Sequence, residues 1–174
     1  MYLETERLMI VDLRPDMAQV ICENSQDEDN RRFVPDEVFD TVEEAGEVVN
    51  YLISQYGTED GPLLYPVLTK SGENIGYVQL CPVEEGWEIG YHIAKRYTGN
   101  GYASEAVSAF LPVMAKKKGI SVIYGICLRE NAASEKVMEK CGFKNVFTGV
   151  GPYQGEDRMI VKNVWEVPEN AREE

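Results

Sequence analysis

The sequence predicts an α/β (α+β) fold, with a single mixed sheet of six or seven strands flanked by about four helices. Two observations lead to this prediction. Short segments that alternate apolar and polar residues, which are typical of strands, stand in both halves of the chain. Between them, a glycine-rich loop opens a helix that precedes Val122–Leu128, an almost continuous apolar run. Such a run is typical of a central strand covered on both faces, and a strand, a helix and a strand in this order make one right-handed parallel crossover.

In the first half of the chain, a strand is expected at residues 8–13, and Pro15 opens a short helix that reaches Asn24. The polar stretch 26–40 is expected to be a loop between helices. Thr41 is followed three residues later by a glutamate, which is the capping box of a longer helix. That helix carries a core-facing stripe of apolar residues at helical spacing: Val42, Ala45, Val48, Val49, Leu52, Ile53 and Tyr56.

The period then changes from helical to strand-like. Strands are expected at 64–68 and 75–80, around the hairpin signal Lys70-Ser71-Gly72, and a third at 87–93. Alternation along this third strand places three residues on the face opposite its large apolar side chains: Glu88, Gly90 and His92.

In the second half, the helix after the glycine-rich loop ends at Gly119, behind three lysines that suit a helix C-terminus. Asn131 is expected to cap a second helix, which Gly142 terminates. Two closing strands are expected at 143–150 and 158–167, linked by the five residues between 150 and 156.

The length of 174 residues corresponds to about one domain, so residues 1–174 are expected to form a single domain with a frayed tail at 168–174. Acidic residues number 30 and basic residues 17, a formal charge of −13, which disfavours binding to nucleic acid. A partner steered by charge would be cationic, although an acidic surface also serves solubility alone. No run of about 18 apolar residues is present, so no membrane span is expected.

The four cysteines form no CxxC pair, and a single histidine leaves no basis for a histidine-rich metal site. We therefore expect free thiols, no bound metal and a cytoplasmic location. Charged residues near the N-terminus argue against a signal peptide.

The loop before the long helix reads Arg96-Tyr97-Thr98-Gly99-Asn100-Gly101-Tyr102-Ala103. Glycines at this place let the backbone approach a ligand, and the first amides of a helix attract an anion such as a pyrophosphate. Arg96 can add a full positive charge. The two glycines could equally shape a turn and bind nothing. Neither the GxxxxGK[ST] phosphate loop nor a dinucleotide fingerprint with its downstream acid is present.

Arg-x-x-Gly-x-Gly at the start of a helix resembles the coenzyme A pyrophosphate loop of the GNAT acetyltransferase superfamily. Further segments resemble the ribosomal-protein-alanine N-acetyltransferase branch of that superfamily, in the same order along the chain: Glu6-Arg7-Leu8, Ile75-Gly76-Tyr77-Val78, Glu88-Ile89-Gly90-Tyr91, Asn131-Ala132-Ala133-Ser134 and Glu139-Lys140-Cys141-Gly142-Phe143.

This resemblance implies a sheet that splits between its two central parallel strands, with acetyl-CoA as co-substrate in the split. It places the pantetheine arm along the backbone of His92 and Ile93, like an added strand. It places the pyrophosphate on Gly99, Asn100, Gly101, Tyr102 and Ala103, with Arg96 beside it. Asn131 and Ser134 would contact pantetheine near the thioester.

The implied reaction is direct attack of an amine on the thioester in a ternary complex. Glu88 is the candidate base, with His92 as an alternative base and a merely solvated or cation-attracting Glu88 as the other interpretation. Many family members protonate the leaving thiolate with a tyrosine at the position of Met138, so here Ser134 or a water must substitute. Ser134 could instead bond only its own backbone, and Asn131 could act only as a helix cap.

The sequence therefore predicts an N-acetyltransferase whose acceptor is a protein N-terminus or a small cationic amine. A non-catalytic acyl-CoA-binding or sensing module with the same fold is the alternative. No nucleic-acid or membrane partner is expected, and a homodimer is compatible with the prediction.

Overall fold

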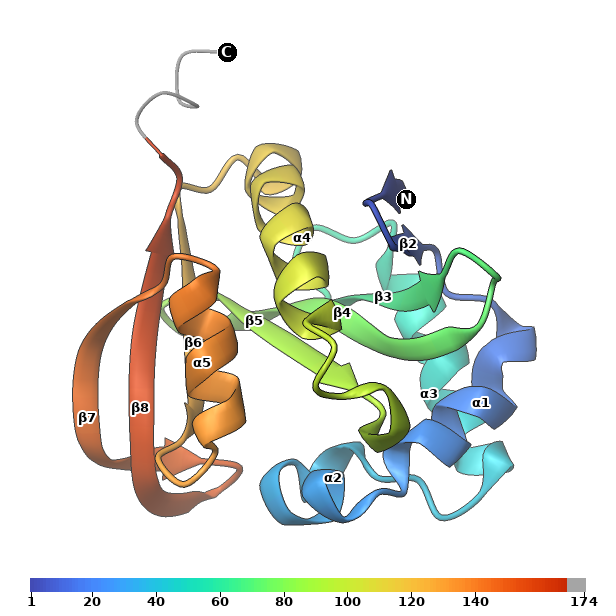
Figure 1. Ribbon diagram of the computed structural model, residues 1–174, viewed down its shortest axis with the longest axis horizontal. Coiled ribbons are helices and arrows are strands. Elements are labelled where there is room, and N and C mark those ends of the chain that lie inside the picture. The colour runs from blue at the N-terminus through green and yellow to red at the C-terminus, as the bar shows by residue number, and fades with distance from the viewer. Residues whose placement is uncertain (169–174) are drawn as a thin grey trace.

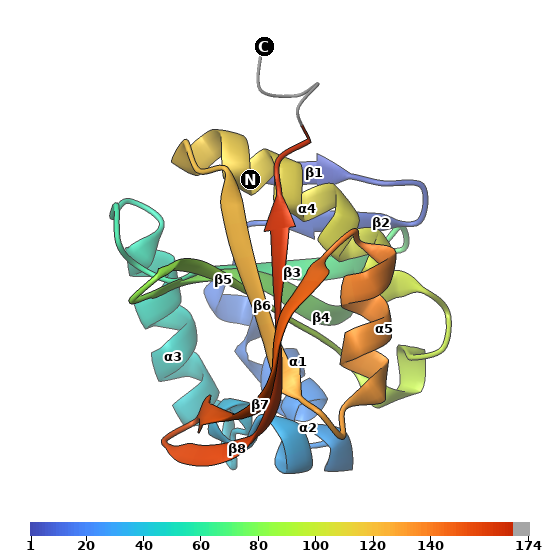
Figure 2. The ribbon, with the colours of Figure 1, turned by 90° about the vertical axis from the view of Figure 1, so that its left-hand side faces the viewer.

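The computed structural model describes residues 1–168, and these form one eight-stranded mixed sheet in the order β1-β2-β3-β4-β5-β6-β8-β7 (Figures 1 and 2). The strands are β1 (Tyr2–Glu4), β2 (Leu8–Val11), β3 (Leu63–Thr69), β4 (Asn74–Val83), β5 (Gly86–Ile93), β6 (Val122–Leu128), β7 (Lys144–Tyr153) and β8 (Glu156–Glu166). The helices are α1 (Ala18–Ser25), α2 (Glu28–Phe33), α3 (Val42–Gln55), α4 (Tyr102–Lys118) and α5 (Ala132–Lys140), with short 3-10 turns η1 (Pro15–Met17), η2 (Pro35–Glu37) and η3 (Lys95–Tyr97). The mixed α/β class is confirmed. The tail expected to fray lies, apart from Pro168, outside the described residues.

The eighth strand is β1, which pairs antiparallel with β2 through Leu3 opposite Ile10. Three residues are too few to show an alternating pattern, so the sequence placed the first strand at Leu8.

The stretch 26–40, expected to be a loop, contains α2 and η2. Asp27 caps α2 by accepting a hydrogen bond from the amide of Asn30 at 2.8 Å. Acidic residues fill the first turn of α2 and two arginines the last, which suits the helix dipole. Only one large apolar residue, Phe33, belongs to α2, so the helix has no stripe for a periodicity argument to find.

The N-terminal half of the sheet is covered on both faces. Leu8 and Ile10 of β2 are fully buried in the main core, which includes the inner side of α4. Met9 and Val11, the residues that alternate with them, pack on a second apolar cluster formed with α1 and α3. Helix α4 therefore covers one face and α1 and α3 the other, as the two views of the ribbon show (Figures 1 and 2).

The two central strands part almost as soon as they meet. The parallel strands β5 and β6 share one pair of residues in register, Glu88 with Tyr124. On its other side, β5 pairs with β4 along its whole length, from Gly86 to Ile93. Beyond Glu88, the edge of β5 that faces β6 therefore has no strand partner, and this opening is the split that the sequence resemblance implied.

The closing hairpin is longer than expected. The strands β7 and β8 remain paired up to Tyr153 and Glu156, so the turn is two residues long instead of five. Gln154 and Gly155 have φ of 49° and 80°, the left-handed pair that a tight type I′ hairpin requires. The extra paired residues carry Tyr153 to the mouth of the split.

Candidate active site

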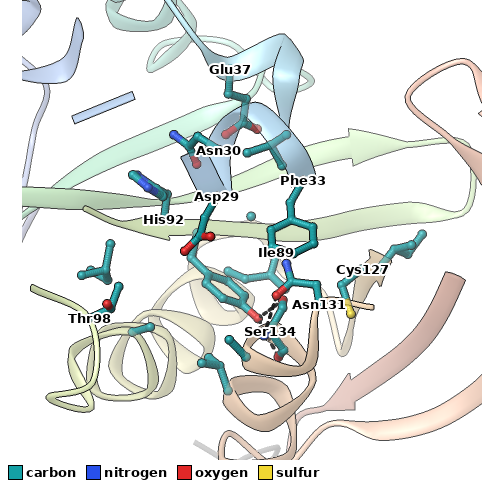
Figure 3. Close-up of a pocket in the computed structure, with 18 of the residues that line it drawn as sticks. Asp29, Asn30, Phe33, Glu37, Ile89, His92, Thr98, Cys127, Asn131 and Ser134 are labelled. Carbon is teal, nitrogen blue, oxygen red and sulfur yellow. Dashed lines mark hydrogen bonds between the residues drawn. The ribbon is translucent and has the colours of Figure 1, made fainter. Parts of the chain in front are cut away.

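A cavity of about 660 Å³ occupies the split between β5 and β6 and extends to the start of α4 (Figure 3). Nine residues singled out in the sequence line it: Glu88, His92, Ile93, Gly99, Gly101, Tyr102, Ala103, Asn131 and Ser134. They come from β5, the glycine-rich loop, α4 and α5, so the fold brings together segments that are up to 46 residues apart in sequence (Glu88 to Ser134).

The start of α4 has the properties of an anion site. Gly99 and Gly101 have φ of 81° and 79°, a backbone conformation that favours glycine. No side chain caps the helix, so the amides of its first turn are free to bind a ligand. Glu105, the one acidic residue of that turn, forms an ion pair with Arg7 at 2.6 Å, which neutralises its charge. These donors fit a pyrophosphate.

Two residues of the predicted loop site lie outside the cavity lining. Arg96 is exposed, with its guanidinium 4.8 Å from the centre of the Tyr97 ring. The Asn100 amide group donates to the carbonyls of Tyr97 and Thr98, which shapes the loop from within. Arg7, which the sequence did not single out for this role, donates to the Asn100 carbonyl at 2.9 Å and so ties the loop to the N-terminal segment.

Alternation along β5 turns Glu88 and Gly90 toward one face of the sheet and Tyr91 toward the other. Glu88 and Gly90 stand opposite Cys81 and Gln79 of β4. A Cβ on Gly90 would lie 2.6 Å from Gln79 Nε2, so the glycine gives that side chain its room. Tyr91 points the other way and reaches α5.

Glu88 lies where β5 and β6 part, and its carboxylate accepts no hydrogen bond from the described residues. Burial raises the pKa of Glu88 to about 7. The positive charge of Lys162 opposes this increase in pKa, and the negative charge of Glu37 adds to it. Lys162 itself is ion-paired with Glu85. A carboxyl group with this pKa can accept a proton near neutral pH.

Glu37, at the end of η2, is a cavity residue that the sequence did not identify. Gln79 Nε2 donates to Glu37 Oε1 at 3.1 Å, and the second oxygen receives no hydrogen bond within residues 1–168. Burial raises the pKa of Glu37 to about 7 as well. No ion pair within the described chain involves Glu37 or Glu88, so the cavity holds two carboxyl groups without a bonded cation. The sequence did not place Glu37 in the site because residues 26–40 were expected to be a loop.

His92 is bound to the chain itself. Its Nε2 lies 3.1 Å from Oδ2 of Asp27, and its side chain is 11% exposed. Burial lowers the pKa of His92, and Asp27 opposes this effect. Because Asp27 also caps α2, the contact between His92 and Asp27 fixes α2 beside β5, which is a structural role for the ring.

Asn131 and Ser134 occupy the first turn of α5. The Asn131 side-chain oxygen accepts from the Ser134 amide at 3.1 Å, so Asn131 does cap the helix. The hydroxyl of Tyr91 lies 2.7 Å from Ser134 Oγ, one of the hydrogen bonds drawn in Figure 3. Met138, at the position where the family carries a tyrosine, is 2% exposed and fills the space left by Gly125. Met138 belongs to the core and contributes no group to the lining of the cavity.

The mouth of the cavity on the side of Glu37 is bridged. The Tyr153 hydroxyl donates to the Phe33 carbonyl at 2.9 Å, which joins the closing hairpin to α2. An ion pair of 2.9 Å between Arg32 and Glu130 adds a second link, with Arg158 3.8 Å from the same carboxylate. Helix α2 therefore contacts the C-terminal half of the chain across this end of the opening.

Residues 1–168 contain no group of three or more metal-binding side chains placed to hold an ion. In the same range, no helix is both long and apolar enough to cross a membrane. All four cysteines are free thiols. The cytoplasmic location and the homodimer stay predictions.

A sheet that splits between two parallel strands and an uncapped helix start behind two glycines are the features that the resemblance to the GNAT superfamily implied. The model of the acetyltransferase (GNAT) domain matches residues 7–144, most of the chain. The chain therefore belongs to the GNAT acetyltransferase family, whose members use acetyl-CoA.

Among curated relatives, an uncharacterized N-acetyltransferase of Bacillus subtilis, YnaD, is 30% identical over 147 residues, which are 83% of each chain. Among solved structures, a GNAT-family acetyltransferase from Bacillus anthracis is 26% identical, with a TM-score of 0.80 over 95% of this chain and 98% of the other. An acetyltransferase from Salmonella typhimurium that modifies the N-terminal serine of ribosomal protein L7/L12 has the same TM-score of 0.80, over 97% of this chain and 100% of its own. At 15% sequence identity, this neighbour shows only that the two chains share a fold.

Proposed function

We propose that this protein transfers the acetyl group of acetyl-CoA to a small cationic primary amine held beside Glu37 and Glu88. One observation carries the proposal. Two carboxyl groups that have no ion-pair partner among the described residues lie in the cavity between β5 and β6. When bound, acetyl-CoA supplies an activated acetyl thioester. The glycines and free amides at the start of α4 would hold its pyrophosphate, and Asn131 and Ser134 would meet its pantetheine arm.

Glu88 would accept the proton of the attacking amine. A lysine-type amine has a pKa of about 10.4, so almost all of it is protonated at pH 7, whereas an α-amine has a pKa of about 7.7 to 8.0. A cation that enters next to two carboxyl groups favours their ionised form. Glu88 can then take the proton while Glu37 keeps a negative charge beside the substrate. His92 is less suited to this task because Asp27 engages its Nε2.

The backbone of β5 would stabilise the oxyanion. The Ala94 amide donates to Ile75 on β4 at 2.9 Å. Because successive residues of a strand direct their amides to opposite edges, the Ile93 amide points to the edge that faces the split. A donor at this edge, which no strand covers, is suited to the charge that develops on the thioester oxygen.

The bridged mouth favours a small acceptor over a protein N-terminus. A polypeptide acceptor needs a groove that continues beyond the reacting amine, whereas Tyr153 and Phe33 meet across this end of the cavity. A protein N-terminus remains the second candidate acceptor, because the Salmonella neighbour of similar fold acts on one.

The test follows release of the coenzyme A thiol from acetyl-CoA with three kinds of acceptor. These are linear diamines from 1,3-diaminopropane to 1,6-diaminohexane, n-butylamine, and short peptides that begin with alanine or serine. We expect turnover with a diamine to exceed turnover with n-butylamine and with the peptides. Preferential acetylation of the peptides would contradict the small-amine acceptor while leaving acetyl transfer intact. Binding of acetyl-CoA without thiol release for any amine would support the non-catalytic sensing module.

A matched pair of variants tests the part assigned to Glu37. Glu37→Gln removes the cavity charge, and Asp36→Asn removes the same charge from the exposed neighbouring residue. Glu37→Gln should raise KM for the diamine about tenfold, whereas Asp36→Asn should leave KM nearly unchanged. Equal effects of the two variants would mean that only the overall charge of this region matters.

A further inference from the structure

Tyr91 contributes a hydroxyl group to the cavity, and the reaction scheme above does not use it. The side chain comes from β5 and crosses to the first turn of α5, where its oxygen lies 2.7 Å from Ser134 Oγ and 3.1 Å from the Ser134 carbonyl oxygen. The Cys127 thiol on β6, which also lines the cavity, is a second side-chain hydrogen-bond partner of Ser134. The backbone of Ser134 is fixed independently by the Asn131 cap. Both the position and the orientation of the serine hydroxyl are therefore set by named contacts.

We propose that Tyr91 is a positioning residue that aims the Ser134 hydroxyl at the sulfur of the departing coenzyme A. The proposal rests on the acetyl transfer proposed above. The Tyr91 oxygen lies closer to Ser134 Oγ than to the Ser134 carbonyl oxygen. With the phenolic hydrogen placed in this shorter contact, the hydrogen of the serine hydroxyl is left to point into the cavity. Ser134 gives this proton to the sulfur, which keeps the electron pair of the broken carbon–sulfur bond. Solvent returns a proton to the serine oxygen in the same step, so no serine alkoxide forms, and the Tyr91 hydrogen bond holds the oxygen in place throughout.

The surroundings of both residues fit this assignment. Burial raises the pKa of Tyr91, so its hydroxyl stays protonated and can act as a donor at neutral pH. Met138 cannot take part, because its sulfur faces the core and accepts from Asn163 at 3.5 Å. A tyrosine hydroxyl is thus brought to the serine from β5, while the α5 position that carries a tyrosine in many family members is used for packing.

The first experiment is a double-mutant cycle of Tyr91→Phe and Ser134→Ala on the enzyme with a saturating amine. Tyr91→Phe should lower kcat roughly tenfold, the scale of one hydrogen bond between neutral groups, with little change in KM for acetyl-CoA. The double variant should be no slower than Ser134→Ala, because Tyr91 acts only through the serine. A kcat for Tyr91→Phe within twofold of the parent enzyme, or a double variant whose loss is the product of the two single losses, would overturn the proposal.

A matched control separates positioning from general stability. Tyr65 is a buried core tyrosine whose hydroxyl accepts from Lys117 at 3.0 Å and which does not line the cavity. Tyr65→Phe should lower the melting temperature and leave kcat unchanged. If Tyr65→Phe lowered kcat as much as Tyr91→Phe, the effect would reflect lost packing and the proposal would fail.

The same cycle is measured on the ligand-free protein by urea unfolding, which does not depend on turnover. The two substitutions should be coupled about three- to tenfold in the unfolding equilibrium constant if the hydrogen bond forms in solution. Additive effects would refute the contact. Absence of turnover in the parent enzyme with every amine would remove acetyl transfer and this role together. An active parent with an equally active Tyr91→Phe variant refutes the role alone.

Discussion

Replacing Glu88 with glutamine should make activity depend more steeply on pH and make stability depend less steeply on pH. The substitution keeps the shape of the side chain and removes its ability to accept a proton. With the pKa of Glu88 near 7, kcat/KM of the parent enzyme should rise through pH 7 and then level off, until the amine itself begins to lose its proton. The variant depends on amine that is already neutral, so its kcat/KM should rise about tenfold per pH unit up to the amine pKa. At pH 7, loss of a general base lowers the rate by about 10²- to 10⁴-fold.

The stability effect follows from the same pKa. Because the folded pKa of Glu88 is raised from 4.5 to about 7, the folded state binds its proton more tightly than the unfolded state does. The stability of the parent protein therefore falls as pH rises from about 4.5 to about 7, whereas a glutamine does not titrate. The advantage of Glu88→Gln in unfolding free energy should grow by about 2 to 3 kcal/mol between pH 5 and pH 8. For a chain of this size, that is roughly 4 to 12 °C in melting temperature.

The assay pairs kinetic pH profiles with thermal unfolding at pH 5 and pH 8. Glu84→Gln is the control, because Glu84 is exposed in the turn between β4 and β5 and its loss changes the net charge equally. Equal stability gains of the two variants at pH 8, or a parent-like pH profile for Glu88→Gln, would contradict a proton-accepting Glu88 with a raised pKa. A higher KM that salt reduces, with kcat intact, would show that Glu88 only attracts the amine.

Three further substitutions probe the other parts of the site. Gly101→Asp should weaken acetyl-CoA binding at least tenfold relative to Gly101→Asn, measured by calorimetry; both side chains tolerate the left-handed backbone, so equal affinities would mean that no phosphate charge lies there. Ser134→Ala should lower kcat about 10²-fold and raise the dissociation constant of acetyl-CoA much less; equal losses in both would leave Ser134 a binding residue only. Met138→Tyr should lower the melting temperature by roughly 2 to 12 °C through overpacking against Gly125 and should not raise kcat; a faster enzyme would show that this side chain does reach the cavity.

Much of the fold and part of the cavity lining could be predicted because they depend on local patterns. The alternation of Glu88 and His92 on β5, the glycines before α4 and the cap at Asn131 are each encoded within a few residues. Glu37 could not be found in this way, because α2 and η2 lack an apolar stripe and take their place from Asp27, which bonds His92 from 65 residues away.

Tyr91 escaped notice for a related reason. Its strand position was predicted correctly, yet a tyrosine in an apolar alternation indicates core packing, and its partner Ser134 lies 43 residues further along the chain. Contacts between distant segments depend on the register and angle of whole elements, which periodicity does not determine. The turn at Gln154 was misjudged on a smaller scale, because Gly151-Pro152 resembles the start of a loop but continues β7.

The single pair in register between β5 and β6 makes the sheet a pair of arms joined at a pivot. Glu88 stands at that pivot with Tyr124, whereas the glycine-rich loop and Asn131 follow the far ends of the two strands. A small rotation of one arm against the other displaces these far ends most and Glu88 least. Such a rotation would change the width of the cavity far more than the place of Glu88, and the hydrogen bond between Tyr153 and Phe33 would oppose it.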